Sequence, residues 1–270
     1  MNVKNKTIVV TGGGNGMGRE LVLQLLAKGA NVAAVDINEA ALSTTESLSG
    51  DKKSHLSVNV VDITDREAVE NLSKQVVAQF GAIDGVINNA GIIQPFVRFN
   101  DLDFATIDKV ISVDFFGMLN MTKLFLPCLL KRPEAHIVNI SSMGGLFPVP
   151  GGASYGAAKA AVKQFTDILN AELRNTHVRM TVVCPGGVQT DIKFNSGAAE
   201  ARFDENELKK AFIKPVKPAK AAEIIIDAIE KNRYKVLIGK DIKAINFIHK
   251  LFPNMAQKII NKKMKLHIPD

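Results

Sequence analysis

Short apolar runs alternate with helical patterns along the whole chain. The runs cover residues 7–11, 31–36, 56–62, 83–89, 136–142, 178–184 and 235–239. Between them, apolar residues recur at helical spacing, as at Val69, Leu72, Val76 and Phe80. Such strand–helix alternation predicts a parallel sheet covered by helices on both faces. We therefore expect a doubly wound α/β fold with seven strands in one sheet.

Two stretches depart from this alternation. Residues 188–217 are polar and mixed, which predicts a mobile lid between a strand and the next long helix. Residues 241–266 predict one or two basic amphipathic helices, broken at Pro253. We place residues 1–240, lid included, in a single domain and treat residues 241–270 as a helical extension of it.

The composition narrows the class of protein. A chain of 270 residues with 46% hydrophobic content can bury one substantial core. Cys128 and Cys184 lie far apart and the five histidines are scattered, so we expect no metal site. We see no secretion signal and no apolar run of about 20 residues. A cytoplasmic protein is expected, with any membrane contact made from the surface.

The net charge of +7 is unevenly distributed. Residues 231–270 carry ten Lys and Arg against two acidic residues, whereas the rest of the chain carries 24 basic and 25 acidic residues. No nucleic-acid-binding motif accompanies the basic tail, so nucleic acid is not an expected partner. The tail interleaves apolar residues and lysines. This pattern suits a helix on anionic lipid, or a helix packed on the body or another subunit, which we favour.

A glycine-rich turn follows the first strand, in residues 11–18. Gly12, Gly16 and Gly18 stand where such turns need unusual φ angles, close approach to a pyrophosphate, and tight helix–strand packing. The amides at the start of the next helix can then receive phosphates. A flexible turn is the alternative, but the strand before and the helix after favour nucleotide binding.

Acidic residues close the second and third strands. A carboxylate at Asp36 can accept hydrogen bonds from an adenosine ribose and repels a 2′-phosphate; its alternative role is to cap a helix over 38–48. Neither Asn15 nor Ile37 offers a positive charge, so NAD is expected over NADP. Asp62 is placed to meet the adenine, or equally to cap the helix from residue 65.

Two further strand ends, Asn88–Gly91 and Pro185–Thr190, carry small or polar residues at the edge where open α/β sheets bind ligands. Asn88 or Asn89 can tie adjacent strands together, and Thr190 with the backbone of 186–188 could hold a carboxamide. The residues expected to contact the cofactor are Gly12, Asn15, Gly16, Met17, Gly18, Asp36, Ile37, Asp62, Ile63, Asn89, Ala90, Gly91, Tyr155, Lys159, Pro185, Gly186, Val188 and Thr190.

Tyr155 and Lys159 are four residues apart on a predicted helix, so both side chains project from one face. A nearby cation favours the phenolate and lowers the pKa of a tyrosine, which would make Tyr155 a general base. A core tyrosine beside a solvated lysine is the alternative. Ser142, at the end of the fifth predicted strand, can bond a substrate oxygen. No Gly-x-Ser-x-Gly elbow or partnering histidine supports a hydrolase triad.

Taken together and in this order, these motifs resemble the short-chain dehydrogenase/reductase family, from Thr7 to about Gly239. The resemblance implies a Rossmann-type fold and hydride transfer between NAD and a secondary alcohol or ketone. It also implies that Tyr155 exchanges the alcohol proton, that Ser142 steadies the carbonyl oxygen and that Lys159 bonds the nicotinamide ribose. The family is commonly dimeric or tetrameric through its fourth and fifth helices, and the small, apolar face of 157–169 agrees.

One residue departs from the family pattern. Asp114 stands where the family usually has an asparagine that organises a water leading to the lysine. Asp114 could still hold a water, but it adds a negative charge near Lys159. We count it with Ser142, Tyr155 and Lys159 as the catalytic set and expect activity to survive.

The substrate-facing positions are mostly apolar, namely Ser142, Gln94, Phe96, Met143, Leu146, Phe147 and Val149, although several could be ordinary core. They favour a lipophilic alcohol or ketone such as a steroid, retinoid, fatty or terpenoid compound. Two rival functions remain. One is a catalytically quiet NAD-binding regulator, suggested by Asp114. The other is a ketoacyl reductase whose basic tail docks an acidic carrier protein, against whose usual NADPH preference Asp36 argues.

Overall fold

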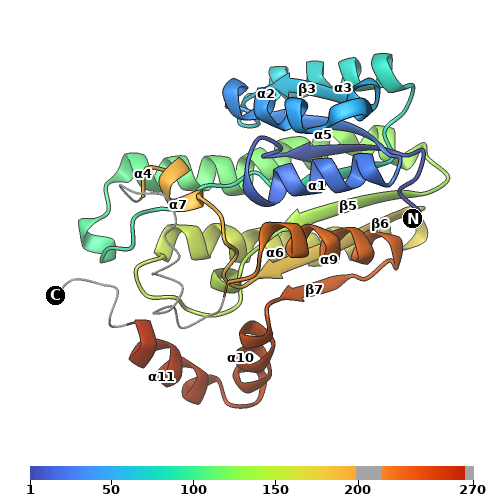
Figure 1. Cartoon of the computed structure of the whole chain (residues 1–270). Coiled ribbons are helices and arrows are strands. Elements are labelled where there is room, and N and C mark those ends of the chain that lie inside the picture. Colours follow the sequence, from blue (N-terminus) through green and yellow to red (C-terminus); the bar gives the residue numbers. More distant parts are fainter. Residues whose placement is uncertain (199–214, 265–270) are drawn as a thin grey trace.

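The computed structural model describes residues 1–198 and 215–264, and the side chains of 240, 241 and 262–264 are not among the described ones. Seven parallel strands form one sheet in the order β3-β2-β1-β4-β5-β6-β7 (Figure 1). The strands are β1 Thr7–Thr11, β2 Asn31–Asp36, β3 Leu56–Val60, β4 Gly85–Asn88, β5 Ala135–Ile140, β6 Val178–Pro185 and β7 Lys235–Ile238. The chain order reverses between β1 and β4, which places a topological switch point in the middle of the sheet.

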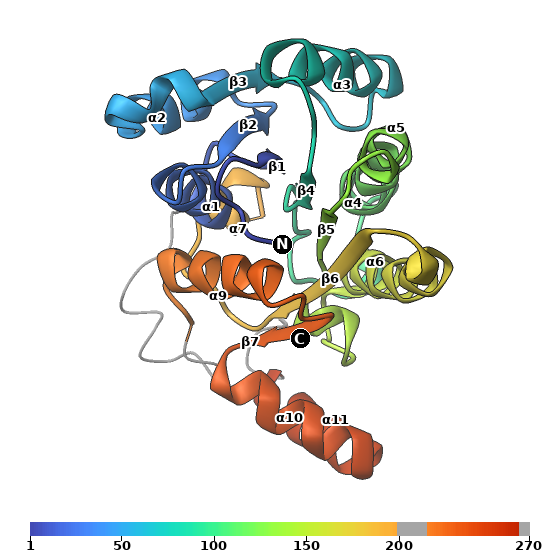
Figure 2. The same ribbon diagram turned by 90° about the vertical axis from the view of Figure 1, so that its right-hand side faces the viewer.

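Helices cover both faces of the sheet, as Figure 2 shows along its edge. The helices are α1 Gly16–Ala27, α2 Glu39–Leu48, α3 Arg66–Phe80, α4 Phe104–Ile111, α5 Met118–Leu130, α6 Ala153–Glu172, α7 Ile192–Asn195, α9 Pro218–Glu230, α10 Lys240–Leu251 and α11 Pro253–Met264. Shorter helical turns lie at η1 Gly50–His55, η2 Phe99–Asp101, η3 Ser112–Gly117, η4 Met143–Gly145 and η5 Leu173–Asn175. The predicted doubly wound, seven-stranded fold is confirmed.

Two apolar clusters hold the layers together. Helices α1 and α9 pack on one face, where Leu21, Leu25 and Ile225 are fully buried. Helices α3, α5 and α6 pack on the other face, with Leu72 and Phe125 in the core. Strands with buried side chains on both faces explain the near-continuous Val and Ile content of the sequence. Strand β3 differs because it lies at the sheet edge and leaves Val58 and Val60 exposed.

One helical stretch in the described part of the chain, Phe104–Leu130, is long and apolar enough to cross a bilayer by length and composition alone. It comprises α4, η3 and α5 and packs against α3, α6 and the sheet. Met121, Phe125 and Leu129 are fully buried along it. Such burial is typical of a core helix in a globular domain, and core helices can equal membrane-spanning helices in length and apolar composition.

The C-terminal extension forms two helices, with Pro253 at the start of the second, as the sequence predicted. Ile242, Ile245 and Ile260 pack with Phe147 and Val182 in a third apolar cluster. The extension is therefore anchored beside the carboxyl end of β6. Of the predicted lid, the structure describes α7 and a bridge between Val188 and Val216; residues 199–214 lie outside the described residues.

His136 in β5 is a buried titratable group that makes stability depend on pH. Its ring is 1% exposed and its Nε2 atom lies 2.8 Å from the Thr181 hydroxyl. Burial, aided by the positive charge of the Met1 amino group, lowers the pKa of His136 to about 3. The folded protein keeps the ring neutral, whereas the unfolded chain takes up a proton below about pH 6.5. This contribution to stability is therefore complete above that pH and is lost as the pH falls towards 3.

Between about pH 7.5 and pH 5, we expect the free energy of unfolding of the wild type to fall by about 2 kcal/mol more than that of His136→Gln. The glutamine can still bond Thr181 but has no group that titrates in this range. Urea unfolding of both proteins at both pH values measures the difference. The same pH dependence in the two proteins would contradict the assignment.

Candidate active site

The glycine turn after β1 has no room for side chains. Gly12 and Gly16 adopt φ angles of 68° and 50°, in the left-handed region that favours glycine. A Cβ atom on Gly18 would lie 1.8 Å from the carbonyl oxygen of Gly12. Helix α1 therefore begins directly against the strand end, with its first amides at the turn. Such a backbone cradle fits a pyrophosphate.

Asp36 lies beside this turn and does not cap the next helix. Its Oδ2 atom accepts a hydrogen bond from the Gly14 N–H at 3.0 Å and its Oδ1 atom accepts one from the Asn38 N–H at 3.0 Å. Asn38, rather than Asp36, caps α2 by accepting from the Ala41 N–H. The adjacent Ile37 is 68% exposed. The carboxylate keeps lone pairs for a ribose, so the predicted ligand role fits its position better than the capping role.

Arg19 is a cation at the same turn and is not among the residues predicted to contact the cofactor. Its Nη2 atom donates to the Gly14 carbonyl at 2.5 Å and to Asn15 Oδ1 at 3.1 Å, and its Nε atom donates to the Thr45 hydroxyl. Its place one residue after Gly18 was visible in the sequence. The fold of α2 against the turn, which brings Thr45 there, was not.

The end of β3 resolves a second alternative. Asp62 Oδ1 accepts from the backbone and the hydroxyl of Thr64, whereas Asp65 caps α3. Asp62 is therefore not the helix cap and remains a candidate for the adenine. The side chain of Ile63 is buried against η3, where a Cβ on Gly117 would lie 2.6 Å from it. The Ile63 side chain therefore packs in the core. The predicted contact of Ile63 with the cofactor would involve its backbone.

The two asparagines after β4 have separate roles. Asn88 donates to Asn139 of β5 at 2.8 Å and to Thr122 of α5 at 3.0 Å, and so ties neighbouring elements together. Asn89 donates to the carbonyl of Thr11 at 2.9 Å. The Thr11 hydroxyl in turn accepts from the N–H groups of Asn89 and Ala90. These bonds hold the 88–91 segment against the glycine turn.

The 185–190 segment reaches the glycine turn from the other side of the switch point. The Gly186 N–H donates to Ile238 of β7, and the Thr190 N–H donates to Val188. A Cβ atom on Gly16 would lie 3.0 Å from Thr190 Cγ2. The predicted cofactor residues from the first and sixth strands therefore meet, although they are more than 160 positions apart in the sequence.

A buried ion pair lies at the centre of the catalytic set. Lys159 Nζ is 3.2 Å from Asp114 Oδ2, with side-chain exposures of 5% and 0%. Asp114 Oδ1 accepts from the Ile92 N–H at 2.7 Å, and Lys159 Nζ donates to the Ile140 carbonyl at 3.3 Å. Asp114 lies on η3, a π-helical segment between α4 and α5, a distortion found frequently at functional sites. Gly91 packs closely against this pair, since a Cβ atom there would lie 3.0 Å from Lys159 Nζ and 3.2 Å from Asp114 Oδ1.

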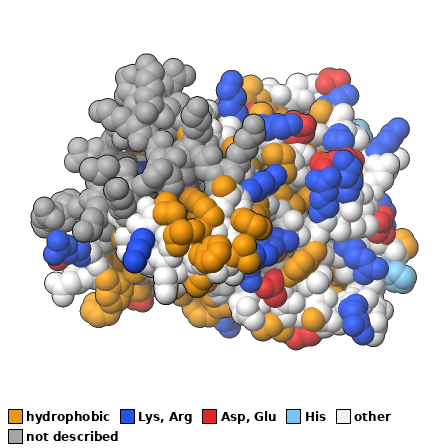
Figure 3. Space-filling model, turned by 90° about the horizontal axis from the view of Figure 1, so that it is seen from below, with side chains coloured by type: hydrophobic (Ala, Val, Ile, Leu, Met, Phe, Trp, Pro, Cys, Tyr) orange, Lys and Arg blue, Asp and Glu red, His pale blue; other side chains and the backbone are white. Residues whose placement is uncertain are grey.

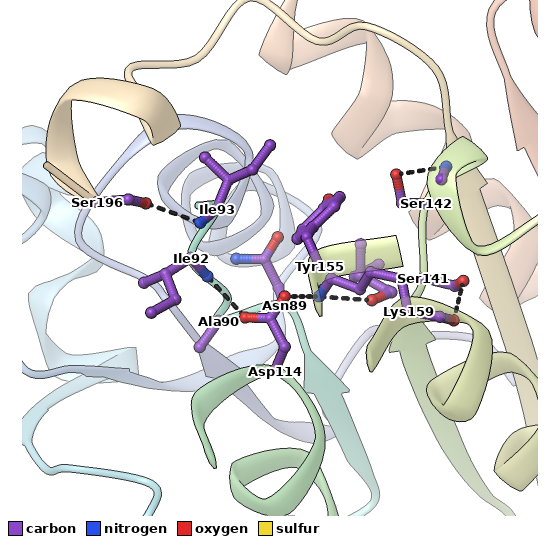
Figure 4. Close-up of polar contacts among 12 residues, drawn as sticks. Asn89, Ala90, Ile92, Ile93, Asp114, Ser141, Ser142, Tyr155, Lys159 and Ser196 are labelled. Carbon is purple, nitrogen blue, oxygen red and sulfur yellow. Dashed lines mark hydrogen bonds and ion pairs between the residues drawn. The ribbon is translucent and has the colours of Figure 1, made fainter. Parts of the chain in front are cut away.

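Tyr155 and Ser142 complete the set, as Figure 4 shows. Lys159 Nζ lies 5.7 Å from the centroid of the Tyr155 ring. Ser142 follows β5 by two residues and its hydroxyl accepts from the Gly144 N–H at 3.1 Å. Ser141 points the other way and donates to the Lys159 carbonyl at 2.7 Å, which fixes α6 against the strand end. The structure thus brings together all four residues predicted as catalytic.

The surroundings of Tyr155 shift the pKa of its phenol upwards. Burial raises the pKa of Tyr155 above its ordinary value; Lys159 opposes this, while Asp114 adds to it and a hydrogen bond with Ser142 lowers it. Burial alone would lower the pKa of Lys159, but Asp114 and Tyr155 raise it. The sequence predicted a lowered pKa for Tyr155, and the structure gives the opposite direction. The physical reason is that burial disfavours the charged phenolate more than the Lys159 ammonium stabilises it, and the Asp114 carboxylate adds to the effect of burial.

Two residues assigned to the substrate also have structural partners. The Gln94 side chain accepts from the Tyr155 N–H at 2.9 Å and donates to the Gly151 carbonyl at 3.1 Å. It caps the start of α6, where Gly152 offers no side-chain cap. The Phe147 ring is 2% exposed and packs edge-on against His249 of α10, 5.4 Å between centroids. Packing and capping therefore account for the positions of both side chains, and their contact with a substrate stays a prediction.

The other substrate candidates lie around the same edge. Met143 and Leu146 are partly buried against the third apolar cluster, and Val149 is half-buried. Phe96 lies under Lys193 of α7, whose Nζ is 5.3 Å from the ring centroid. Helix α7 is also tied to this loop, since the Ile93 N–H donates to the Ser196 hydroxyl at 3.0 Å (Figure 4). The lid segment therefore contacts the loop that leads from β4 to the site.

Comparisons with known proteins agree with this geometry. A family model described as short chain dehydrogenase matches residues 6–201. SadH of Mycobacterium tuberculosis is 34% identical over 262 residues, which cover 95% of this chain and 94% of SadH.

Two solved structures share the fold. A short chain dehydrogenase/reductase from Burkholderia phymatum in complex with NAD has a TM-score of 0.85 at 24% identity, covering 94% of this chain and 96% of that one. A short chain dehydrogenase from Burkholderia cenocepacia in complex with NADP has a TM-score of 0.78 at 25% identity, covering 96% and 99%. Proteins with this fold therefore bind either nucleotide.

Replacing Asp114 by Asn should lower the pKa of Tyr155, because the negative charge that raises it is removed. The chain has two tyrosines and no tryptophan, and burial together with a hydrogen bond to Asp167 raises the pKa of Tyr234 as well. The phenolate absorbance that is lost in Tyr155→Phe therefore reports Tyr155, and its midpoint on raising the pH is compared between the wild type and Asp114→Asn. An unchanged or higher midpoint in Asp114→Asn would contradict the electrostatic argument.

Proposed function

Since the chain belongs to the short-chain dehydrogenase family, we propose that it transfers a hydride between NAD(H) and a lipophilic secondary alcohol or ketone. The observation that carries this proposal is the cluster of Tyr155, Lys159 and Ser142 at the carboxyl ends of the strands. The cluster lies at the same sheet edge as the glycine turn and Asp36. A nucleotide bound at the glycine turn and a substrate bound at Ser142 and Tyr155 would therefore lie at the same edge of the sheet.

In this proposal the side chains move a proton and hold the substrate oxygen. Tyr155 takes the alcohol proton during oxidation and returns one to the carbonyl oxygen during reduction, with Ser142 bonding that oxygen. Proton transfer by a positioned side chain typically contributes roughly 10²–10⁴ in rate. NAD, when bound, accepts or supplies the hydride. The pairing with Asp114 holds the Lys159 ammonium near the phenol. The carboxylate also weakens the stabilisation of the phenolate by that ammonium.

The raised pKa of Tyr155 supports a role as proton donor at neutral pH. A phenol that keeps its proton is ready to protonate a carbonyl oxygen. Alcohol oxidation needs the phenolate and should gain from higher pH. We therefore propose that the rate of alcohol oxidation rises with pH, and that of ketone reduction falls, as the phenol of Tyr155 ionises.

Asp36 supports NAD as the cofactor. Its carboxylate stands beside the glycine turn, where it would repel a 2′-phosphate and bond the ribose hydroxyls. Arg19 is the nearby cation that could favour NADP, but Gly14, Asn15 and Thr45 already accept its hydrogen bonds. The balance of charge at the turn favours NAD.

The surroundings support the remaining parts of the proposal. Met143, Leu146 and Val149 after Ser142 are apolar, which favours a lipophilic substrate. On the outer side of α5 and α6, a groove of about 530 Å³ is lined by Leu119, Leu126 and Phe165 among others. We propose that this groove packs against a second copy, and that the enzyme acts in the cytoplasm.

A screen of hydrophobic alcohols and ketones, read by NADH absorbance, tests the activity. Tyr155→Phe should abolish turnover while still binding NADH, because it loses the proton-transfer group and keeps the cradle. Asp114→Asn should change maximal turnover only modestly, since the amide retains the contact with the Ile92 N–H. Full activity in Tyr155→Phe would rule out the mechanism. No activity in the wild type, with NADH bound, would favour a quiet NAD-binding regulator.

Asp36→Ser should bind NADH roughly ten- to a hundred-fold more weakly, because two charge-assisted hydrogen bonds to the ribose are lost. Its NADPH affinity should fall less or rise, since the repulsion of a 2′-phosphate is removed. Fluorescence titration with both nucleotides measures the ratio, and Asp36→Asn serves as a control that keeps one acceptor oxygen. If the wild type prefers NADPH, the assignment of NAD is wrong.

A further inference from the structure

The corner where α10 meets α11 exposes a group of apolar side chains. Phe247, Leu251, Phe252 and Met255 expose between 47% and 66% of their surface, and Pro253 lies among them. We call these five residues the apolar corner. Except for Phe247 they line, with Asn254 and Lys258, a hollow of about 480 Å³. Figure 3 shows hydrophobic side chains gathered on this side of the molecule. Exposed apolar patches rimmed by polar residues mark interaction surfaces.

Cations share the exposed face with the apolar corner. Lys243 lies four residues before Phe247 and Lys250 three residues after it, so all three project from one side of α10. Lys258 stands in the same relation to Met255 on α11, and all three lysines are exposed. From Ile242 to Pro269 the sequence contains no Asp or Glu. The surface is therefore apolar at its centre and positive at its rim.

The opposite face of the two helices is already used. Ile242, Ile245 and Ile260 are buried against the body, and His249 packs on Phe147. Packing on the body thus accounts for the isoleucines of the amphipathic pattern. The apolar corner and the neighbouring lysines face outward, on two helices whose other face is packed on the body.

We propose that the apolar corner docks on the surface of an anionic lipid bilayer. Phe247, Leu251 and Phe252 would enter the boundary between headgroups and acyl chains, while the lysines reach the phosphates. A bilayer offers a continuous negative plane that matches the exposed lysines of these two helices. A second copy bound through the same surface would bring like charges together, because a two-fold interface pairs a patch with itself.

The docking surface adjoins the site. Phe147, which contacts α10, belongs to the loop that follows Ser142. A docked molecule would hold that loop near the membrane, where a lipophilic substrate concentrates. The inference does not depend on the proposed activity, because it concerns the outer face of α10 and α11 alone.

Co-sedimentation of the full chain with vesicles tests the proposal. We expect binding to vesicles of phosphatidylcholine with phosphatidylglycerol, weaker binding to phosphatidylcholine alone, and loss at high salt. Lys250→Gln/Lys258→Gln should weaken the anionic-vesicle partition roughly thirty-fold. Phe247→Ser/Phe252→Ser should weaken it roughly tenfold or more. NADH binding, expected to be unchanged, verifies that each variant is folded.

Matched controls lie away from the corner. Leu48→Ser removes a comparably exposed apolar side chain on α2, and Lys53→Gln/Lys131→Gln removes the same charge elsewhere. Both controls should bind vesicles as the wild type does. The proposal is overturned if the wild type binds neither vesicle, or if controls and corner variants weaken alike. It is also overturned if Phe247→Ser/Phe252→Ser binds vesicles as the wild type does. In that case the lysines alone would hold the vesicle, and the surface would suit an acidic protein equally well. A change of oligomeric state on substituting the corner, with no vesicle binding, assigns the surface to a second copy.

Discussion

The buried contact between Asp114 and Lys159 is the constraint on which the site depends. Removing two charges from water costs several kcal/mol per ion, and good geometry with further hydrogen bonds must offset this cost. Here the offset comes from the Ile92 N–H on the carboxylate and the Ile140 carbonyl on the ammonium. The π-helical segment, the end of β5 and the first turns of α6 must therefore keep their relative positions.

A polar network beneath this pair supports those positions. Asn88 of β4 reaches Asn139 of β5, and Asn139 donates to the Thr166 hydroxyl of α6 at 2.9 Å. These side chains are buried, so each bond also satisfies a group that would be costly to leave unpaired. Hydrogen bonds thus connect the strands β4 and β5, whose ends lead into the site, to each other and to the helices α5 and α6.

Repetition and spacing made the fold predictable from the sequence. Strands buried on both faces leave unbroken Val and Ile runs, and the glycine turn is specified by backbone geometry that few residues adopt. The candidate site was predictable where a motif encodes its neighbours, as for Tyr155 and Lys159. The structural partners of a residue were not predictable where they are distant in sequence. Gln94 could not be recognised as a cap for α6, nor Phe147 as a partner of α10, because only the folded loops bring these elements together.

The direction in which the pKa of Tyr155 shifts was missed for a related reason, because burial, its largest cause, exists only in the folded structure. The spacing of Tyr155 and Lys159 is local, but the strength of their coupling depends on a third charge, 41 positions before Tyr155 in the sequence. Sequence patterns identify which groups are adjacent along a helix. They do not reveal how a carboxylate from another helix divides the electrostatic influence of a cation.

Three successive residues after β4 link parts of the site that are otherwise separate. Ile92 bonds the carboxylate of the ion pair, Ile93 bonds Ser196 beside α7, and Gln94 bonds the first turn of the helix that carries the phenol. A displacement of α7 would move Ile93, and with it the hydrogen bonds that Ile92 and Gln94 make on either side of it. The position of α7 and the surroundings of the phenol are therefore coupled through these three residues.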